Sequence, residues 1–310
     1  MNRQLAIVFP GQGSQSVGML GELAGVHPEV QATFAEASSV LDYDLWALVQ
    51  NGPEADLNQT DRTQPAMLAA GVAVWRVWTR LGGATPAFMA GHSLGEYTAL
   101  VCAGSLAFTD GIRLVAERGR RMQEAVPAGV GAMAAILGLD DDQVHEACSA
   151  AAQGEVVQAV NFNSPGQVVI AGHKAAVDRA CEGAKAMGAK RAVPLAVSVP
   201  SHSSLMQPAA EAFAATLAAT EIGTPQIPVI HNADVAAYTD PAAIRDALIR
   251  QIYNPVRWVE TVRHLSAQGV TRIVEAGPGK VLAGLNKRID KNVASLAAFD
   301  SASLAEALAG

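Results

Sequence analysis

The segment Gly91-His92-Ser93-Leu94-Gly95 constrains the fold of this chain more than any other. It fits the pattern G-x-S-x-G, in which a serine stands on a sharp turn between a strand and a helix. The apolar residues 87–90 before it predict a buried strand, and residues 96–102 after it predict the first turns of a helix. The glycines leave room for a strained turn, and the helix start supplies unpaired N–H groups beside Ser93. The segment therefore predicts a reactive serine, although the same pattern also occurs as a purely structural turn.

The composition is that of a folded globular protein. The chain has 310 residues, half of them hydrophobic and 16% charged, which is enough for a large core and one or two domains. The formal net charge is −7 and no run is rich in Lys and Arg, so nucleic acid is not an expected partner. Cys102, Cys148 and Cys181 are odd in number and form no C-x-x-C pair, so we expect no disulfide, no metal site and a cytoplasmic location.

Neither of the two apolar segments predicts a membrane element. Residues 5–9 are too short for the hydrophobic part of a signal peptide, and Pro10 and Gly11 follow them directly. Residues 87–108 are apolar, but they contain His92 and Glu96 and have the sharp turn within them. We therefore expect a buried strand and helix there, and no membrane association.

The order of predicted strands and helices indicates an α/β fold with two domains. Strands and helices alternate in residues 1–127, and this pattern resumes in residues 199–310. Between them, residues 128–198 give the order β-α-β-β-α-β, which is the ferredoxin-like arrangement, so a small domain is predicted to be inserted into a large one. Its predicted elements are a strand at 131–139, a helix at 140–152, strands at 156–162 and 167–171, a helix at 174–187 and a strand at 191–197.

Prolines mark three predicted helix starts in the large domain. Gln64-Pro65 opens an apolar segment that continues to about residue 80. Asp240-Pro241 and Asn254-Pro255 each place a capping residue directly before a proline. We expect a helix to begin at each of these three positions.

A serine hydroxyl is a poor nucleophile until a base takes its proton, and His202 is the strongest candidate for that base. It lies in a predicted loop just before a helix, where a side chain can project into a cleft. His92 is adjacent to Ser93, but neighbouring side chains on such a turn diverge. The other histidines lie in ordinary helices or in loops without a motif: His27, His145, His173, His231 and His264. No aspartate stands in an obvious position to complete a Ser-His-Asp triad, which weakens a simple hydrolase interpretation.

Arg118, in a predicted helix at 110–124, has two interpretations. Arg113, Arg120 and Arg121 are close by, which favours an ordinary solvated helix face. The alternative is a guanidinium that holds a substrate carboxylate by two parallel hydrogen bonds. The local pattern alone favours the solvated face.

Seven segments together resemble the malonyl-CoA:acyl-carrier-protein transacylase family, which loads extender units for fatty-acid and polyketide synthesis. They occur in the family's order and span nearly the whole chain, so the set is far more specific than any single segment. The segments are VFPGQGSQ (8–15), GHSLGEY (91–97), MQEAVP (122–127), NFNSPGQ (161–167), VPSH (199–202), QIYNPV (251–256) and EAGPG (275–279). The resemblance implies an α/β-hydrolase-like large domain with the ferredoxin-like insert.

The resemblance also implies a role for each matching residue. Ser93 matches the nucleophile, which takes malonyl from coenzyme A as an ester, and His202 matches its base. Gln251 matches the residue whose main-chain carbonyl orients that histidine, and Arg118 matches the arginine that pairs with the malonyl carboxylate. The remaining matches are Gln12 and Leu94, whose backbone N–H groups would form the oxyanion hole, and Asn161, near the acyl pocket.

The implied reaction has two halves, with malonyl-CoA as donor and the phosphopantetheine thiol of acyl carrier protein as acceptor. We expect no permanently bound cofactor and a monomer, and Leu94 with the VPSH segment favours malonyl over methylmalonyl. Three alternatives stay open: a serine esterase or thioesterase, a discrete acyltransferase of a polyketide synthase or malonate decarboxylase system, and a non-catalytic module with the same fold. Arg118 argues against the first, and the complete set of Ser93, His202, Arg118 and Gln251 argues against the third.

Carrier proteins of this kind are acidic, and so is this chain, so their encounter requires a local basic patch. Scattered solubilising charges are an equal alternative for the basic residues of the chain. The residues expected to form the patch are Lys190, Arg191, Lys280, Lys287, Arg288 and Lys291.

Overall fold

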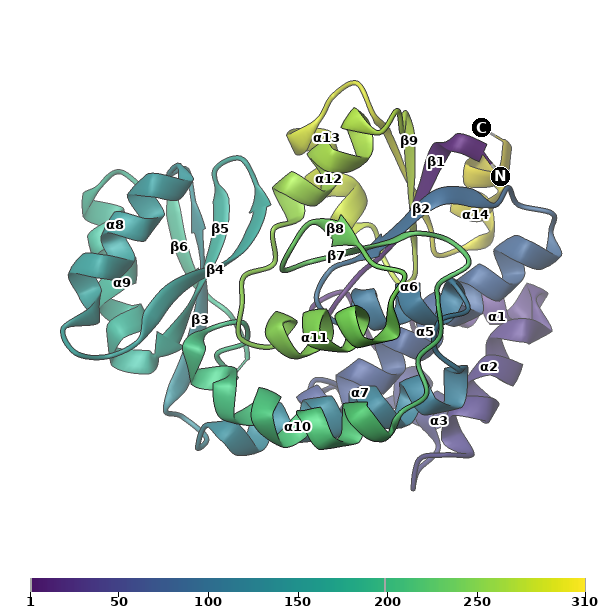
Figure 1. The fold of residues 1–310 in the computed structure, drawn as a ribbon, viewed down its shortest axis with the longest axis horizontal. Coiled ribbons are helices and arrows are strands. Elements are labelled where there is room, and N and C mark those ends of the chain that lie inside the picture. The colour runs from purple at the N-terminus through teal and green to yellow at the C-terminus, as the bar shows by residue number, and fades with distance from the viewer. Residues whose placement is uncertain (1, 198, 310) are drawn as a thin grey trace.

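The computed structural model describes residues 2–197 and 199–309 and has a mixed α/β fold with one large and one small sheet (Figure 1). The predicted domain limits at residues 1, 198 and 310 lie outside the described residues. Figure 1 shows the small sheet with its two helices at one end of the molecule, away from the N- and C-termini.

The large sheet has six strands in the order β10-β9-β1-β2-β7-β8. All neighbours are parallel except the pair β7 and β8. The carboxyl ends of β1, β2, β7 and β9 therefore meet at one edge, which is where open α/β sheets hold their sites. The strands are β1 (Asn2–Phe9), β2 (Pro86–Gly91), β7 (Val229–His231), β8 (Ala236–Ala237), β9 (Arg272–Ala276) and β10 (Ala294–Ala298).

Helices cover both faces of this sheet, as the continuous apolar run of β1 requires. Leu5, Ile7 and Phe9 pack into the core that contains α5, α6 and α7, whereas Ala6 and Val8 pack into the core that contains α12 and α13. The helices of this part are α1 (Gly21–Val26), α2 (Pro28–Ser38), α3 (Leu45–Asn51), α4 (Glu54–Leu57), α5 (Thr60–Arg80), α6 (Gly95–Cys102), α7 (Phe108–Ala125), the 3-10 helix η1 (Ser204–Met206), α10 (Gln207–Ala219), α11 (Pro241–Gln251), α12 (Trp258–Ala267), α13 (Val281–Ile289) and α14 (Ser301–Ala309).

The small sheet is antiparallel, with the order β4-β5-β3-β6. One face packs against α8 and α9, and Met133 and Val169 lie on the opposite face. The chain order within this part is β-α-β-β-α-β, as the sequence predicted. Its elements are β3 (Gly131–Leu137), α8 (Asp141–Ala152), β4 (Val157–Ser164), β5 (Gln167–His173), α9 (Lys174–Ala186) and β6 (Arg191–Pro194).

A short backbone ladder joins the small sheet to the rest of the molecule. Val256 donates its N–H to the carbonyl of Val160 at 2.8 Å and accepts a hydrogen bond from the N–H of Phe162 at 3.0 Å. Val256 thereby forms a parallel bridge with Asn161 of β4. This ladder fixes Asn161 beside the end of the large sheet.

Two of the three proline-marked helix starts are wrong. Helix α5 begins at Thr60, one turn earlier than predicted, and Pro65 is buried inside it. Asn254 does not open α12, which begins at Trp258; its side chain instead donates to the carbonyl of Arg250 at 2.8 Å, at the end of α11. The extended conformation that Val256 needs for its bridge to β4 keeps a helix from forming there. The start at Asp240-Pro241 is confirmed, since the Asp240 carboxylate accepts from the N–H of Ala243 at 2.9 Å.

No helix in the described ranges is long and apolar enough to cross a membrane. The apolar segment around the sharp turn forms β2 and α6.

Candidate active site

The turn at Ser93 has the strand-turn-helix context that its motif requires. Strand β2 ends at Gly91, α6 begins at Gly95, and Ser93 between them has a left-handed backbone with φ of 51°. A Cβ atom on Gly91 would overlap the backbone of Gly95, and one on Gly95 would overlap the carbonyl of Phe9. Both glycines are therefore required by close backbone approach. The turn lifts the Ser93 side chain out of the sheet at the carboxyl end of β2.

His202 lies directly against this serine, 109 residues away in the sequence. Its Nε2 atom is 2.7 Å from Oγ of Ser93, and its Nδ1 atom is 2.8 Å from the carbonyl oxygen of Gln251. A carbonyl only accepts hydrogen bonds, so Nδ1 carries the proton and Nε2 presents a lone pair to the serine hydroxyl. This geometry is that of a base paired with a nucleophile.

Burial keeps His202 neutral. Loss of solvent, reinforced by the nearby charge of Arg118, lowers the pKa of His202 to about 3, although the hydrogen bond to the Gln251 carbonyl acts in the opposite direction. The imidazole is therefore uncharged at neutral pH, which is the form that can accept a proton.

The side chain of Arg118 is 1% exposed and lies beside the same serine. Its Nη1 atom donates to the Gln64 side chain at 2.8 Å, and its Nη2 atom donates to the Gln251 side chain at 3.0 Å and to Oγ of Ser93 at 3.3 Å. The guanidinium carbon is 5.3 Å from the centre of the Tyr97 ring, a cation–π distance. Two amide oxygens and one aromatic face therefore hold a buried positive charge.

The solvated helix face favoured by the local pattern is wrong for Arg118. Helix α7 is amphipathic, and Arg118 lies on its buried side with Leu114 and Met122, which are four residues away in either direction. The exposed side carries the neighbouring arginines, whose ion pairs are Arg113–Asp110, Arg120–Glu117 and Arg121–Glu117.

Six of the seven predicted site residues line one cavity of about 100 Å³ at Ser93. The seventh, Gln251, is fully buried behind Arg118 and His202. The six are Gln12, Ser93, Leu94, Arg118, Asn161 and His202, and apolar lining comes from Met122, Met133, Leu195, Val197 and Val199. The cavity lies between the end of the large sheet and the face of the small sheet that carries Met133.

Two backbone N–H groups at this cavity are free to bind an anion. Within the described residues, the N–H groups of Gln12 and Leu94 have no hydrogen-bond acceptor. The N–H of Ser93 itself is occupied, since it donates to Oδ1 of Asn232 at 2.7 Å. Asn161 also offers an unpaired polar atom, because its buried Oδ1 has no partner in the described part of the chain.

Three buried residues that support the site were assigned no role from the sequence: Gln64, Glu96 and Asn232. Glu96 accepts hydrogen bonds from the backbone N–H of Asn232 at 2.8 Å and from the side chain of Gln251 at 2.9 Å. Its other oxygen is 2.7 Å from Nδ1 of His231, which the sequence placed in a loop without a motif. Glu96 directly follows the G-x-S-x-G segment, so its position in the motif is the only signal that could have found it.

His92 diverges from Ser93, as expected. Its Nε2 atom is 2.8 Å from the side-chain oxygen of Asn163 in β4, and its ring packs against Trp258. Burial lowers the pKa of His92. The residue therefore ties the sharp turn to the small sheet rather than to the serine hydroxyl.

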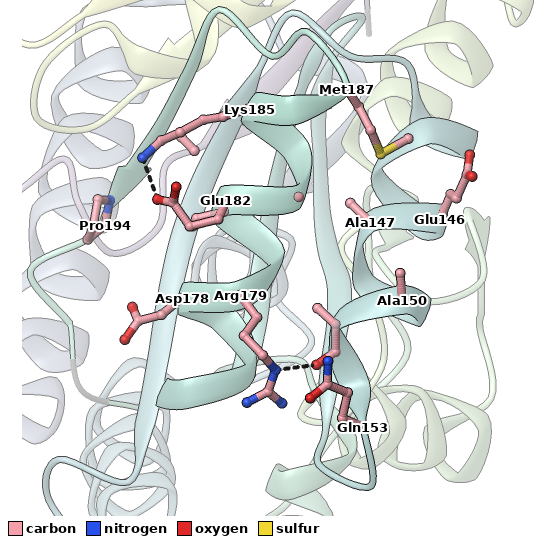
Figure 2. Close-up of a pocket in the computed structure, with 14 residues that line it drawn as sticks. Glu146, Ala147, Ala150, Gln153, Asp178, Arg179, Glu182, Lys185, Met187 and Pro194 are labelled. Atoms are coloured by element: carbon pink, nitrogen blue, oxygen red, sulfur yellow. Dashed lines mark hydrogen bonds and ion pairs between the residues drawn. The ribbon is translucent and has the colours of Figure 1, made fainter.

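A larger hollow of about 800 Å³ lies between α8, α9 and β6, on the opposite face of the small sheet from the cavity (Figure 2). Three of its charged side chains bind within the protein: Lys185 pairs with Glu182, and Arg179 donates to the carbonyl of Ala151 (Figure 2). Its only thiol, Cys181, has its pKa raised by burial and so stays protonated. The hollow thus lacks the reactive groups that meet at Ser93.

Across the described residues, no group of three or more His, Cys, Asp or Glu side chains is placed to hold a metal ion. The polar groups at the cavity include Ser93, His202, Arg118 and the backbone N–H groups around them.

Comparison with known proteins agrees with this geometry. Residues 6–304 match the acyl transferase domain family. The malonyl CoA-acyl carrier protein transacylase of Salmonella typhimurium is 60% identical over 305 residues, which cover 98% of this chain and 99% of that protein. The protein of the same name in Bacillus subtilis is 46% identical over 96% of this chain and 94% of its own length.

Solved structures give the same relationship. An acyl carrier protein S-malonyltransferase from Vibrio cholerae is 64% identical, with a TM-score of 0.95 over 98% of this chain and 99% of its own. A malonyl-transacylase in complex with a type II polyketide synthase acyl-carrier protein is 60% identical, with a TM-score of 0.98 over 99% of each chain. The chain therefore belongs to the acyl transferase family and, within it, to the malonyl CoA-acyl carrier protein transacylases.

Proposed function

We propose that this chain transfers the malonyl group of malonyl-CoA to the phosphopantetheine thiol of acyl carrier protein through a malonyl ester on Ser93. One observation carries the proposal: a buried guanidinium, that of Arg118, lies 3.3 Å from a serine hydroxyl that is itself 2.7 Å from a neutral histidine. The serine and histidine supply acyl transfer, and the guanidinium supplies selection of an acyl group that ends in a carboxylate.

In the first half of the reaction, Nε2 of His202 takes the proton of Ser93 as Oγ attacks the thioester carbonyl. The negative charge that develops on the carbonyl oxygen is bound by the N–H groups of Gln12 and Leu94, and losing one such donor typically slows a reaction by roughly 10²–10³. The tetrahedral intermediate then expels the coenzyme A sulfur, which takes the proton back from His202. The products are malonyl-Ser93 and free coenzyme A.

The second half of the reaction reverses these steps with a different thiol. The phosphopantetheine thiol gives its proton to His202 and attacks the ester carbonyl, and Ser93 leaves with that proton as its hydroxyl is restored. The cavity of about 100 Å³ is well below the roughly 300–1,000 Å³ of sites that enclose a whole ligand. This size supports an enclosed acyl group with the pantetheine arm outside the cavity, and it limits the space for competing water.

Arg118 supports selection of malonyl over acetyl. Its buried Nη2 atom lies 3.3 Å from Oγ of Ser93, where the acyl group would be attached. A substrate carboxylate would pair with the guanidinium, whereas an acetyl group would leave it unpaired, at a cost of about 1–3 kcal/mol or more. A plain serine esterase has no use for such a group.

The division of the chain into domains is also part of the proposal. We assign residues 1–127 and 199–310 to an α/β-hydrolase-like domain and residues 128–198 to a ferredoxin-like insert. The parallel sheet with a serine turn after β2 supports the first assignment, and the β-α-β-β-α-β order with strand order β4-β5-β3-β6 supports the second. We also propose that the protein acts as a monomer.

Fatty-acid synthesis is the proposed pathway, with the cytoplasm as its location and no resident cofactor. A malonyl-transacylase that is 60% identical to this chain was solved in complex with a type II polyketide synthase acyl-carrier protein. A discrete role in polyketide synthesis is therefore the second candidate. Rates of transfer to purified fatty-acid and polyketide carrier proteins from the same organism would separate the two pathways.

Intact-protein mass spectrometry tests the activity directly. Wild type and Ser93→Ala are incubated with malonyl-CoA or acetyl-CoA, and holo carrier protein is then added. We expect a malonyl adduct on wild type only, and its discharge onto the carrier protein. Free malonate without an adduct or transfer would contradict the proposal and indicate a hydrolase.

A further inference from the structure

Asn232 binds both sides of the turn that carries Ser93. Its Oδ1 atom accepts from the N–H of Ser93 at 2.7 Å, and its Nδ2 atom donates to the carbonyl of Gly91 at 2.6 Å. The pairing of β2 with β7 explains this reach across 139 residues, because Met89 faces Val229 and Ala90 faces Ile230 in parallel register. Continuing that register by two residues sets Asn232 beside the start of the turn.

Glu96 and Gln251 complete the enclosure of the Ser93 backbone. The Glu96 carboxylate accepts from the N–H of Asn232 at 2.8 Å and from the Gln251 side chain at 2.9 Å. The same Gln251 nitrogen donates to the carbonyl of Ser93 at 2.9 Å. Both the N–H and the C=O of Ser93 are therefore held by fully buried side chains from distant parts of the chain.

This enclosure matters because Ser93 adopts a left-handed backbone, with φ of 51°, that is unfavourable for a residue with a Cβ atom. Such a conformation persists only where the surroundings hold it. The enclosure also occupies the N–H of Ser93, which leaves the N–H of Leu94 as the donor from this turn for an oxyanion.

We infer that Asn232 is a positioning residue for acyl transfer: it holds the backbone of Ser93 so that Oγ stays in line with His202 and the Leu94 N–H faces the cavity. This inference rests on the proposed function. It assigns Asn232 no contact with the substrate, and Arg118 keeps its holders Gln64 and Gln251 when Asn232 is removed. Removal of the Asn232 side chain should therefore slow the chemical step without changing recognition of malonyl.

The first test is Asn232→Ala, compared with wild type by single-turnover acylation with malonyl-CoA. We expect acylation to slow by roughly 10²-fold, the cost of a small misplacement of a reacting group, with little change in KM or in the malonyl-to-acetyl ratio. Labelling of Ser93 by an uncharged fluorophosphonate should slow in parallel, because that reagent does not use Arg118.

Asn286→Ala is the matched control for lost stability. Asn286 is 1% exposed and accepts a hydrogen bond from the Trp258 indole at 2.9 Å, so its removal also deletes a buried asparagine, but it does not line the cavity. We expect this variant to lose thermal stability while its acylation rate stays near that of wild type. If Asn286→Ala and Asn232→Ala slowed acylation equally, the positioning role would be overturned.

Asn232→Asp provides a readout that does not depend on deletion. A protonated carboxyl can accept from the Ser93 N–H and donate to the Gly91 carbonyl, as the asparagine does, whereas an ionised one cannot donate. Burial and the charge of Glu96 on α6 both favour the protonated form of the introduced carboxyl. The other groups that face residue 232 are His231 on β7 and Gln251 on α11. Arg118 and His202 lie farther away, beyond Ser93. We expect this variant to acylate at least about tenfold faster than Asn232→Ala near pH 5.5, and to lose that advantage as the carboxyl ionises at higher pH.

The outcomes separate this inference from the function on which it rests. Wild type without any malonyl-Ser93 would overturn the proposed function. If wild type is acylated and Asn232→Ala is acylated equally fast, the positioning role alone is overturned. The positioning role alone is also overturned if Asn232→Asp is acylated no faster than Asn232→Ala in acid.

Discussion

The Gln64 side chain accepts a hydrogen bond from Nη1 of Arg118 at 2.8 Å, and this contact joins two helices that the sequence separates by 54 residues. Gln64 is 1% exposed on α5, and Arg118 is equally buried on α7. On the other side of the guanidinium, Gln251 accepts from Nη2 at 3.0 Å. The guanidinium is thus held directly by two neutral amides, and the nearest buried carboxylate, that of Glu96, acts on its charge from the far side of Gln251.

Arg118→Ala should change which acyl group is loaded. Removing a buried charge partner typically costs about 3–5 kcal/mol, so we expect malonyl loading to fall by roughly 10²–10⁴ in kcat/KM. Loading of acetyl should fall far less, because acetyl leaves the guanidinium unpaired in wild type. Competition between malonyl-CoA and acetyl-CoA, read by mass spectrometry, measures the ratio. An equal fall for both substrates would show that Arg118 is only structural.

Gln64→Ala should weaken the same selection without abolishing it. The variant removes one of the two amide acceptors of Arg118, and a hydrogen bond to a charged group is worth about 1.5–3 kcal/mol. We expect KM for malonyl-CoA to rise by about tenfold or more while fluorophosphonate labelling of Ser93 stays unchanged. Unchanged KM would mean that Gln251 and Tyr97 hold the guanidinium without help.

The parts of the site that the sequence predicted lie in short continuous motifs. The glycines around Ser93 and the loop before His202 are local patterns, and the resemblance added Arg118 and Gln251. Gln64 and Asn232 could not be found in this way, because their contacts depend on the packing of α5 on α7 and on the register of β7 against β2. Two helix starts predicted from prolines are wrong, and at Asn254-Pro255 the reason is related. There the tertiary bridge between Val256 and β4 determines the backbone conformation.

Activity should persist in acid well below the ordinary pKa of histidine. In the proposed mechanism His202 acts in its neutral form, and burial lowers its pKa to about 3, so protonation does not remove the base until the pH approaches that value. We expect kcat/KM for malonyl transfer to show no acid limb near 6.5, in brief assays at pH values where the protein stays folded. A limb near 6.5 would mean that the imidazole is solvated during turnover.

The lowered pKa of His202 should also make the folded protein less stable in acid. The unfolded chain protonates His202 below about pH 6.5, whereas the folded chain excludes that proton until about pH 3, so each pH unit between them costs about 1.4 kcal/mol. His202→Ala should remove this contribution. Urea unfolding of both proteins across this range measures the difference in slope, and parallel curves would contradict it.

Glu275 should make stability depend on pH in the direction opposite to that of His202. Burial raises its pKa to about 7, although its carboxylate accepts from the N–H of Ala283 at 2.8 Å at the start of α13. The folded chain therefore keeps a proton that the unfolded chain loses above about pH 4.5, and stability falls as the pH rises towards 7. Glu275→Gln is neutral at every pH and should remove this fall. Urea unfolding at pH values on either side of this range tests it, and an unchanged loss would assign the effect to another group.

The expected carrier-protein patch can be reduced to residues at one end of the small sheet. Leu137 of β3 pairs with Gln167 of β5 on one side and with Arg191 of β6 on the other, and Arg288 of α13 donates to Gln167 at 2.8 Å. Arg191 and Arg288 thus flank the same strand ends. Within the described residues, none of the six basic residues expected in the patch forms an ion pair: Lys190, Arg191, Lys280, Lys287, Arg288 and Lys291. All six residues are exposed to solvent.

Reversing these charges should slow transfer to the carrier protein and leave the chemistry intact. Starting from isolated malonyl-enzyme, Arg191→Glu with Arg288→Glu should lower the second-order rate with holo carrier protein by roughly tenfold or more at low salt, because steering of this kind is electrostatic. Transfer to free pantetheine, which carries no protein surface, should be unchanged. High salt should narrow the gap between variant and wild type, since screening removes the attraction that the variant has lost. Equal transfer to carrier protein by both enzymes would place the docking surface elsewhere.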